Sequence, residues 1–201
     1  HIENDEILTP IDEHVFETAF YRKPNEKSKI HFTISKEFQT DFLKITNKYD
    51  DVEITFSYQN ETSDTIAVNA DNTPFRTSDN ELFFRPGGHG ALIENLNQLQ
   101  SDIIFIMNID NIFQNNRELN LKSKKLLGGI LLYIKKEVDA TLKKFQKNEI
   151  NENNIKEIIH FIETKMSISL PQEFKMFQFD YQKEYLIKIL NRPIRVWGMV
   201  K

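Results

Sequence analysis

Residues 82–111 constrain the fold of this chain more than any other stretch. Three of its six glycines, Gly87, Gly88 and Gly90, fall within four residues. An apolar run precedes them, a helix-like run follows them, and a second apolar run ends in Asn-Ile-Asp-Asn at 108–111. This order of strand, glycine loop, helix and strand is typical of a parallel sheet, because parallel strands need a long crossover connection.

The glycine loop predicts a ligand site. Glycine has no Cβ, so backbone N–H groups can approach a ligand closely, and the start of the next helix adds partial positive charge. Ligands of open α/β sheets bind at the carboxyl ends of the strands, where Asp110 lies. A nucleotide held by the loop and a metal held by Asp110 is the simplest interpretation. The alternatives are a tight turn at the loop and an Asp110 that bonds its own backbone.

Four histidines receive structural rather than catalytic interpretations. His89 is interpreted as a loop residue at the helix start rather than a general base, because no partner for proton transfer lies nearby in the sequence. His31 stands in an apolar strand and is interpreted as a core histidine with satisfied hydrogen bonds. His14 and His160 lie on predicted helices, and their spacing points to no chemistry.

Composition excludes several classes of function. With 201 residues, of which 39% are hydrophobic and 28% charged, we expect one soluble globular domain. The net charge of −4 and the pI near 5.8 disfavour nucleic-acid binding, which usually needs a basic face. The chain has no cysteine, so a disulfide or a thiolate metal site is excluded. Because the longest apolar run is far shorter than the ~20 residues of a bilayer span, and the N-terminus lacks a signal-peptide pattern, we expect a cytoplasmic protein without a membrane partner.

Apolar periodicity predicts strands that alternate with helices. Thr9, Pro10 and Asp12 form a typical helix start. Period-two alternation at 52–58 predicts a strand that ends at Gln59, and the apolar run at 102–107 predicts a central buried strand. The other predicted elements are strands at 30–34, 65–68, 82–85 and 194–200 and helices at 36–49, 91–96, 121–147, 153–165 and 182–191. Together they predict an α/β domain with a largely parallel sheet.

Two families resemble this chain. The stretch from Phe105 to Asn111 is similar to the strand that closes the nucleotide site of the UDP-sugar pyrophosphorylases, and Pro86 to Gly90 is similar to their glycine loop. More closely, the chain resembles a bacterial family described as domain of unknown function 4301 over nearly its full length. The matching stretches are Glu13-His14, 31–35, 64–68, 72–76, 84–92, 192–195 and 198–201.

The pyrophosphorylase resemblance implies a fold and a site. The fold would be a three-layer α/β sandwich with a mostly parallel mixed sheet, of the nucleotidyltransferase (GT-A, Rossmann-like) type. Gln59 would read the edge of a uracil base, and Asp110 would bind Mg²⁺ beside the α-phosphate. The residues implied to cradle the nucleotide are Gly87, Gly88, His89, Gly90 and Asn108.

Phosphate contacts are assigned to Arg85 and Lys201. A guanidinium matches the geometry of a phosphate, and Arg76 shares this property. Either arginine alternatively pairs with a nearby acid, Glu81 or Asp79.

These inferences lead to an expected function. We expect one nucleotidyltransferase-like domain over 1–201 that binds a uridine nucleotide and Mg²⁺, and that forms a UDP-sugar from UTP and a sugar 1-phosphate. The resemblance also implies a triphosphate-gripping loop before Thr9 and a further portion after Lys201, so we expect a fragment that is inactive alone. The alternatives are a non-catalytic nucleotide-binding module and a structural or interaction domain. The sequence does not determine the oligomeric state.

Overall fold

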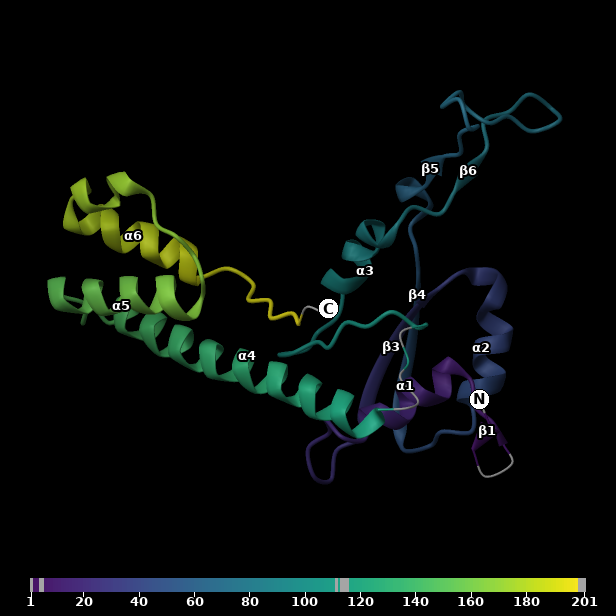
Figure 1. Cartoon of the computed structure of the whole chain (residues 1–201), viewed down its shortest axis with the longest axis horizontal. Helices are drawn as coiled ribbons and strands as arrows, with labels where there is room; N and C mark the ends of the chain where they lie inside the picture. Colours follow the sequence, from purple (N-terminus) through teal and green to yellow (C-terminus); the bar gives the residue numbers. More distant parts are fainter. Residues whose placement is uncertain (1, 4–5, 111, 113–115, 199–201) are drawn as a thin grey trace. The chain divides into compact units, whose positions relative to one another are not determined.

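The computed structural model describes residues 2–3, 6–110, 112 and 116–198 (Figure 1). The chain divides into two compact units, His1–Phe113 and Gln114–Lys201, and each has its own hydrophobic core. Helices and strands both occur, which confirms the general α/β class. The assignment of the whole chain to a single domain stays a prediction.

A pair of parallel strands forms the centre of unit 1. Strand β3 (Ser28–Ile34) pairs with β4 (Val52–Tyr58) along its whole length. The crossover between them contains a 3-10 turn, η1 (Lys36–Phe38), and the helix α2 (Gln39–Thr46). Both predicted strands and the predicted crossover helix are therefore confirmed, although α2 itself is shorter than the predicted span.

One face of this strand pair is apolar and covered by helices. Ile11 and Val15 of α1 (Pro10–Thr18) are buried together with Phe32 of β3, and side chains of α2 pack against them. The ring of Phe42 from α2 makes edge contacts with Phe32 and with the ring of Phe56 from β4. Burial of this face is what holds α1 and α2 to the strands.

The other face of the pair is polar, which is unusual for parallel strands. Residues that are directly opposite in the register pair with each other: Lys29 with Glu53 at 3.3 Å, and His31 Nδ1 with Thr55 Oγ1 at 2.8 Å. The second ring nitrogen of His31 lies 2.8 Å from Ser57 Oγ. His31 therefore has satisfied hydrogen bonds, as predicted, but it lies on the polar face.

Residues 60–86 form a projecting arm that leaves the end of β4 (Figure 1). After the short turn η2 (Glu61–Ser63), β5 (Thr65–Ile66) pairs antiparallel with β6 (Phe84–Arg85). Backbone hydrogen bonds join three chain segments in a closed ring: Ala67 donates to Phe83, Phe83 to Phe75, and Phe75 to Ala67. The predicted strands at 65–68 and 82–85 are thus confirmed only as short pieces of this arm, outside the parallel pair.

Two other features of unit 1 differ from the predictions. Residues 103–108 are not a strand, and Ile106 in the middle of the predicted buried run is 70% exposed. Tyr21, just after α1, stacks on Phe105 of this segment, and His14 of α1 contacts the backbone oxygen of Ile109, which follows it. The helix after the glycine loop is short, a 3-10 turn η3 (His89–Leu92) followed by α3 (Ile93–Asn97), so the charge effect of a long helix start is small here. At the N-terminus, β1 (Ile2–Glu3) and β2 (Glu6–Ile7) form an antiparallel pair.

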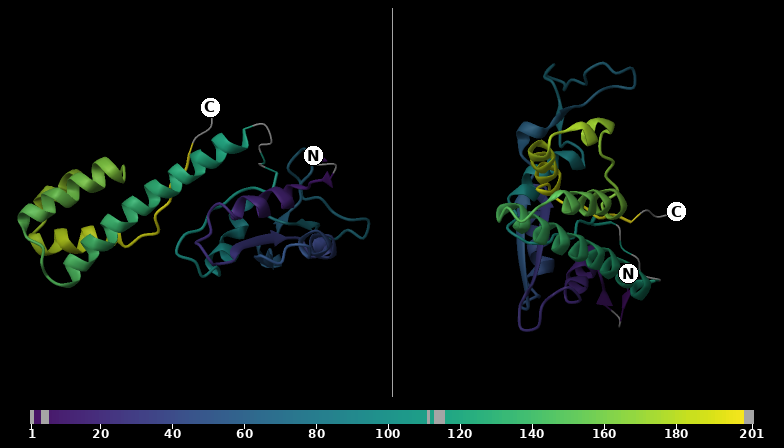
Figure 2. Two further views of the ribbon diagram at one scale, coloured as in Figure 1. Left: turned by 90° about the horizontal axis from the view of Figure 1, so that it is seen from below. Right: turned by 90° about the vertical axis from the view of Figure 1, so that its left-hand side faces the viewer.

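Unit 2 is helical in its described part. It contains α4 (Arg117–Gln146), α5 (Glu152–Lys165), the turn η4 (Gln172–Met176) and α6 (Phe179–Leu190), which confirms the three predicted helices. Figure 2 shows α6 beside α5 and the C-terminal part of α4, and these helices share one core. The predicted strand at 194–200 is wrong for its described residues. No helix among the described residues has both the length and the apolar character of a bilayer span.

Candidate functional site

Gln59 stands directly after β4, at the carboxyl end of the parallel pair. Its side-chain nitrogen Nε2 donates to Ser63 Oγ at 3.1 Å and to Asp64 Oδ1 at 3.4 Å. A carboxylate can only accept, so the contact with Asp64 fixes which end of the Gln59 amide carries the hydrogens. Within the described part of the chain, no hydrogen bond engages the carbonyl oxygen Oε1.

The glycine loop packs against the turn that follows Gln59. A Cβ added at Gly87 would lie 2.7 Å from the backbone oxygen of Ser63, 3.1 Å from Ala91 Cβ and 3.4 Å from Gln59 Nε2. A side chain at position 87 would therefore collide with the turn. The structure brings Gln59 and Gly87 side by side.

The two other glycines of the loop have open surroundings. A Cβ added at Gly88 or Gly90 would meet no atom of the described structure within 4 Å. Gly88 has φ of −70°, a value that any residue adopts. The fold therefore requires a glycine at Gly87 but not at Gly88 or Gly90. His89 between them is exposed and is the first residue of η3.

Asn95 of α3 ties the glycine loop to β4. Its side chain is 6% exposed, and Nδ2 donates to Ser57 Oγ and to the backbone oxygen of Tyr58, both at 2.8 Å. Ser57 also contacts His31, whose burial lowers its pKa and favours the neutral imidazole. The sequence interpretation missed Asn95.

Asn108 and Asp110 lie in an exposed turn after the 103–107 segment. The backbone N–H of Ile112 donates to the backbone oxygen of Asp110 at 3.0 Å. His14 Nε2 lies 3.0 Å from the backbone oxygen of Ile109, and the ring of Tyr21 stacks on Phe105 with centroids 4.4 Å apart. Contacts with α1 and with the residues just after it therefore position this turn. The sequence interpretation missed His14, although Glu13-His14 is one of the stretches that match the resembling family.

The predicted site residues form two groups. Gln59 and the glycine loop form the first group, which β4 and α3 position. Asp110 belongs to the second group, which is positioned by the contact of His14 in α1 with the backbone of Ile109. Arg85 is exposed on β6, opposite Thr65. Within the described part of the chain, no hydrogen bond or ion pair joins the two groups or connects either one with Arg85. Lys201 lies outside the described residues.

Asp110 is the residue with the chemistry to bind a metal ion at this turn. Among the described residues, no group of three or more His, Asp or Glu side chains lies close enough to hold a metal by itself. A Mg²⁺ ion needs few protein carboxylates, because phosphate oxygens and water complete its octahedral shell. A single aspartate beside a bound nucleotide suits Mg²⁺ in this respect.

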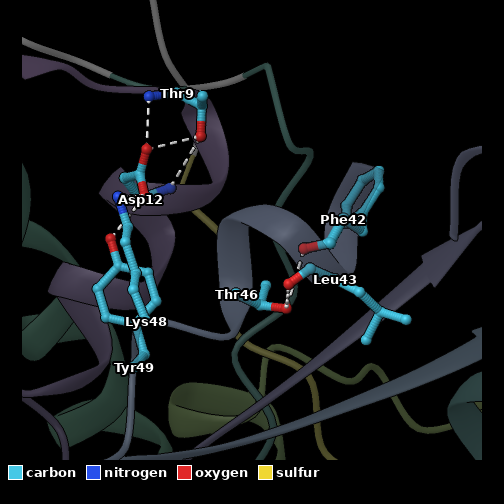
Figure 3. Close-up of polar contacts among 7 residues, drawn as sticks. All are labelled: Thr9, Asp12, Phe42, Leu43, Thr46, Lys48 and Tyr49. Carbon is cyan, nitrogen blue, oxygen red and sulfur yellow. Dashed lines mark hydrogen bonds and ion pairs between the residues drawn. The ribbon is translucent and has the colours of Figure 1, made fainter. Parts of the chain in front are cut away.

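A buried carboxylate fixes α1, which in turn supports the Asp110 turn. The Asp12 side chain is 3% exposed and accepts from Thr9 N at 2.7 Å and from the Tyr49 hydroxyl at 2.6 Å, with Lys48 Nζ at 2.9 Å (Figure 3). Burial by itself would raise the pKa of Asp12, but these donors outweigh it and lower the pKa to about 2. Asp12 therefore stays ionised and anchors the start of α1 to the end of α2.

A shallow depression of about 480 Å³ lies at the opposite end of the parallel pair from Gln59. It surrounds the residues that precede β3 and β4 and contains charges of both signs. Its lining residues are Arg22, Asn25, Glu26, Lys27, Asp50 and Asp51. Ligands of parallel sheets bind at the carboxyl ends of the strands, so this depression is not the candidate site.

Comparison with known proteins gives one family. No curated protein and no solved structure gives a match to the chain. The model of the family described as Domain of unknown function (DUF4301) matches residues 1–201, the whole chain. The chain therefore belongs to the DUF4301 family.

Proposed function

We propose that unit 1 binds a uridine nucleotide together with Mg²⁺ and is nucleotidyltransferase-like. The observation behind this proposal is the contrast among the glycines of the loop. Packing against Ser63 explains why position 87 is a glycine. At positions 88 and 90, by contrast, no atom of the described structure occupies the space that a Cβ would fill. Glycine loses more conformational entropy on folding than other residues, so its presence there needs another reason. Close approach of the loop backbone to a ligand supplies that reason.

The orientation of Gln59 supports a uracil base. Its Nε2 is engaged by Ser63 and Asp64, so the atom that it offers to a ligand is the acceptor Oε1. Uracil presents an N3–H donor between two carbonyl acceptors, and the N–H groups of the glycine loop suit those carbonyls. Cytosine and adenine have an unprotonated ring nitrogen on the corresponding edge, which would oppose Oε1. This pattern favours uracil, or the similar thymine, over cytosine and adenine.

The phosphate end of the nucleotide is assigned to the second group of residues. Asp110 would hold Mg²⁺ against the phosphates, with Asn108 on the nucleotide and with Arg85 as a phosphate ligand. In the proposed reaction an oxygen of a sugar 1-phosphate attacks the α-phosphorus of UTP in line. The bond from that phosphorus to the bridging oxygen breaks, and pyrophosphate leaves. Catalysis of this kind depends mostly on positioning and charge neutralisation.

The fold proposed with this function is the three-layer sandwich with a mostly parallel mixed sheet. The β3–α2–β4 crossover is one repeating piece of such a sheet, and α1 and α2 form a layer on one face. Gln59 lies at the carboxyl end of β4, where ligands bind in folds of this type.

A non-catalytic nucleotide-binding module is the second candidate. The observation that favours it is the separation of the two residue groups. Gln59 and the glycine loop are positioned by β4 and α3 without any contribution from the segment that contains Asp110. Base binding can therefore persist where turnover is lost.

A thermal-shift panel of UTP, CTP, ATP, GTP and dTTP, each with and without Mg²⁺, tests both candidates. A ligand at 100 times its Kd adds about 2.7 kcal/mol of stability, which is a shift of a few degrees for a protein of this size. A shift that is selective for UTP and requires Mg²⁺ supports the first candidate. A UTP shift without Mg²⁺ dependence supports the second, and no shift with any nucleotide rejects both. The Gly88→Val variant, which keeps the fold and blocks the loop, is the matched control.

A further inference from the structure

We propose that His14 is a positioning residue that holds the turn of Asn108 and Asp110 in the geometry needed for Mg²⁺. This inference rests on the proposed function, because it concerns the same metal ion. It assigns a role to a helix residue that lies 95 positions before its hydrogen-bond partner.

The first observation is the contact itself. The His14 side chain is 4% exposed, and its Nε2 lies 3.0 Å from the carbonyl oxygen of Ile109. A carbonyl only accepts, so Nε2 bears the hydrogen and donates it. The carbonyl of Ile109 and the N–H of Asp110 belong to one planar peptide group. A hydrogen bond to this carbonyl therefore sets the orientation of the peptide that leads directly into Asp110.

The second observation is that His14, the donor, lies in a helix that other contacts hold in place. Two residues before His14, Asp12 accepts hydrogen bonds from Thr9 and Tyr49, and one residue after it Val15 lies in the core of unit 1. His14 is thus flanked on both sides by anchored residues. A donor on such a support can fix a partner that is not itself rigid.

The third observation is that the partner needs support of this kind. Residues 103–108 are not a strand, so no regular ladder holds the approach to the turn. Stacking of Tyr21 on Phe105 fixes the beginning of the segment, and the His14 bond fixes its end. Loss of the bond would free the turn without disturbing Gln59, which bonds Ser63 and Asp64, or the glycine loop, which Asn95 ties to β4.

The test compares two amides that differ by one methylene. In His14→Gln the side-chain NH₂ reaches the position of Nε2 and can still donate to Ile109, whereas in His14→Asn it stops near Nδ1 and cannot. UTP binding is measured by calorimetry over a Mg²⁺ titration. We expect His14→Asn to weaken the apparent Mg²⁺ affinity by about 10-fold or more, as for other residues that orient metal ligands, and to leave Mg²⁺-free UTP binding unchanged. We expect His14→Gln to retain most of the wild-type Mg²⁺ affinity, and His160→Asn in unit 2 serves as the control.

The outcomes separate this inference from the proposed function. If wild-type protein binds UTP without Mg²⁺ dependence, the proposed function fails first. If the wild type depends on Mg²⁺ and both His14 variants keep wild-type Mg²⁺ affinity, or both lose it equally, the positioning role is overturned.

A wild-type NMR measurement works even if a variant does not fold. The ¹⁵N-coupled Nε2–H signal of His14 should be visible and should shift when Mg²⁺ is added to the UTP complex, and a signal that stays in place contradicts the role.

Discussion

Individual side chains define the candidate site more sharply than its backbone outline does. Gln59 and Gly87 of the glycine loop are 28 positions apart in the chain and lie side by side in the fold. Asn95 and His14, which hold the two halves of the site in place, were not predicted. Both are polar residues on helices whose partners are backbone or hydroxyl oxygens far away in the sequence. Single-sequence periodicity identifies the buried face of a helix but does not identify such a distant acceptor.

The glycine loop gives the first prediction. Gly87→Ala should lower the free energy of unfolding by about 1–3 kcal/mol, because the new Cβ overlaps the backbone of Ser63. Gly88→Val should change stability by less than about 1 kcal/mol and abolish the UTP-induced thermal shift. Urea denaturation and thermal shift, measured on both variants, check the pair. Equal stability of the two variants would contradict the packing role of Gly87.

Asp12 gives the second prediction, a pH dependence of stability. Its pKa is about 2 in the folded protein against 3.8 as the reference value for the unfolded chain. The ionised side chain therefore stabilises the fold fully above about pH 4, and this contribution disappears as the pH falls toward 2. A shift of this size corresponds to roughly 2 kcal/mol. Urea midpoints measured from pH 5 to pH 2 should fall more steeply for the wild type than for Asp12→Asn, and parallel profiles would contradict the assignment.

At the scale of elements, the sequence predicted strands and helices well where a pattern was long. The strand at 52–58 alternates strictly, and the helices of unit 2 repeat their apolar residues every three or four positions. The apolar run at 102–107 was predicted as a central strand and is not a strand. Periodicity reports that such a run avoids water but does not report whether a neighbouring strand is available to complete a ladder. Here the run is contacted by the ring of Tyr21, which stacks on Phe105.

The link between α3 and β4 gives the third prediction. Asn95→Leu removes the two bonds that Asn95 donates, to Ser57 Oγ and to the Tyr58 carbonyl. Ser57 Oγ keeps its contacts with His31 and Thr33, so the main cost is the lost bond to the carbonyl, about 1–3 kcal/mol. We expect a lower urea midpoint and weaker UTP binding, because the loop loses its attachment to the strand. Asn97→Leu, at an exposed position of the same helix, is the control and should change neither quantity.

At the scale of the whole molecule, the described candidate site residues and the helical core of α4, α5 and α6 lie in different units. The predicted site residues that the structure describes all belong to unit 1. The core of unit 2 is built from α4, α5 and α6 together with Ile150 and with Phe174 of η4. The sequence predicted those helices but gave no boundary between two cores, because no linker of distinctive composition separates them.

This division gives the fourth prediction. A protein made of residues 1–113 should keep the UTP-induced thermal shift, and one made of residues 114–201 should be helical by circular dichroism without responding to UTP. The physical reason is that each unit buries its own apolar side chains. A UTP-induced thermal shift of the protein made of residues 114–201 would contradict the assignment of nucleotide binding to unit 1.

The ring of backbone bonds among Ala67, Phe75 and Phe83 has a consequence for the order of folding. All three segments come from within about 20 consecutive residues, so the arm closes through short loops whose entropic cost is small. The β3–β4 pair instead requires residues separated by a whole helix to meet. Local contacts form faster than distant ones. We therefore expect the arm to acquire its native pairing before the parallel strands do. In that order of events, β6, which directly precedes the glycine loop, is already paired when β4 pairs with β3.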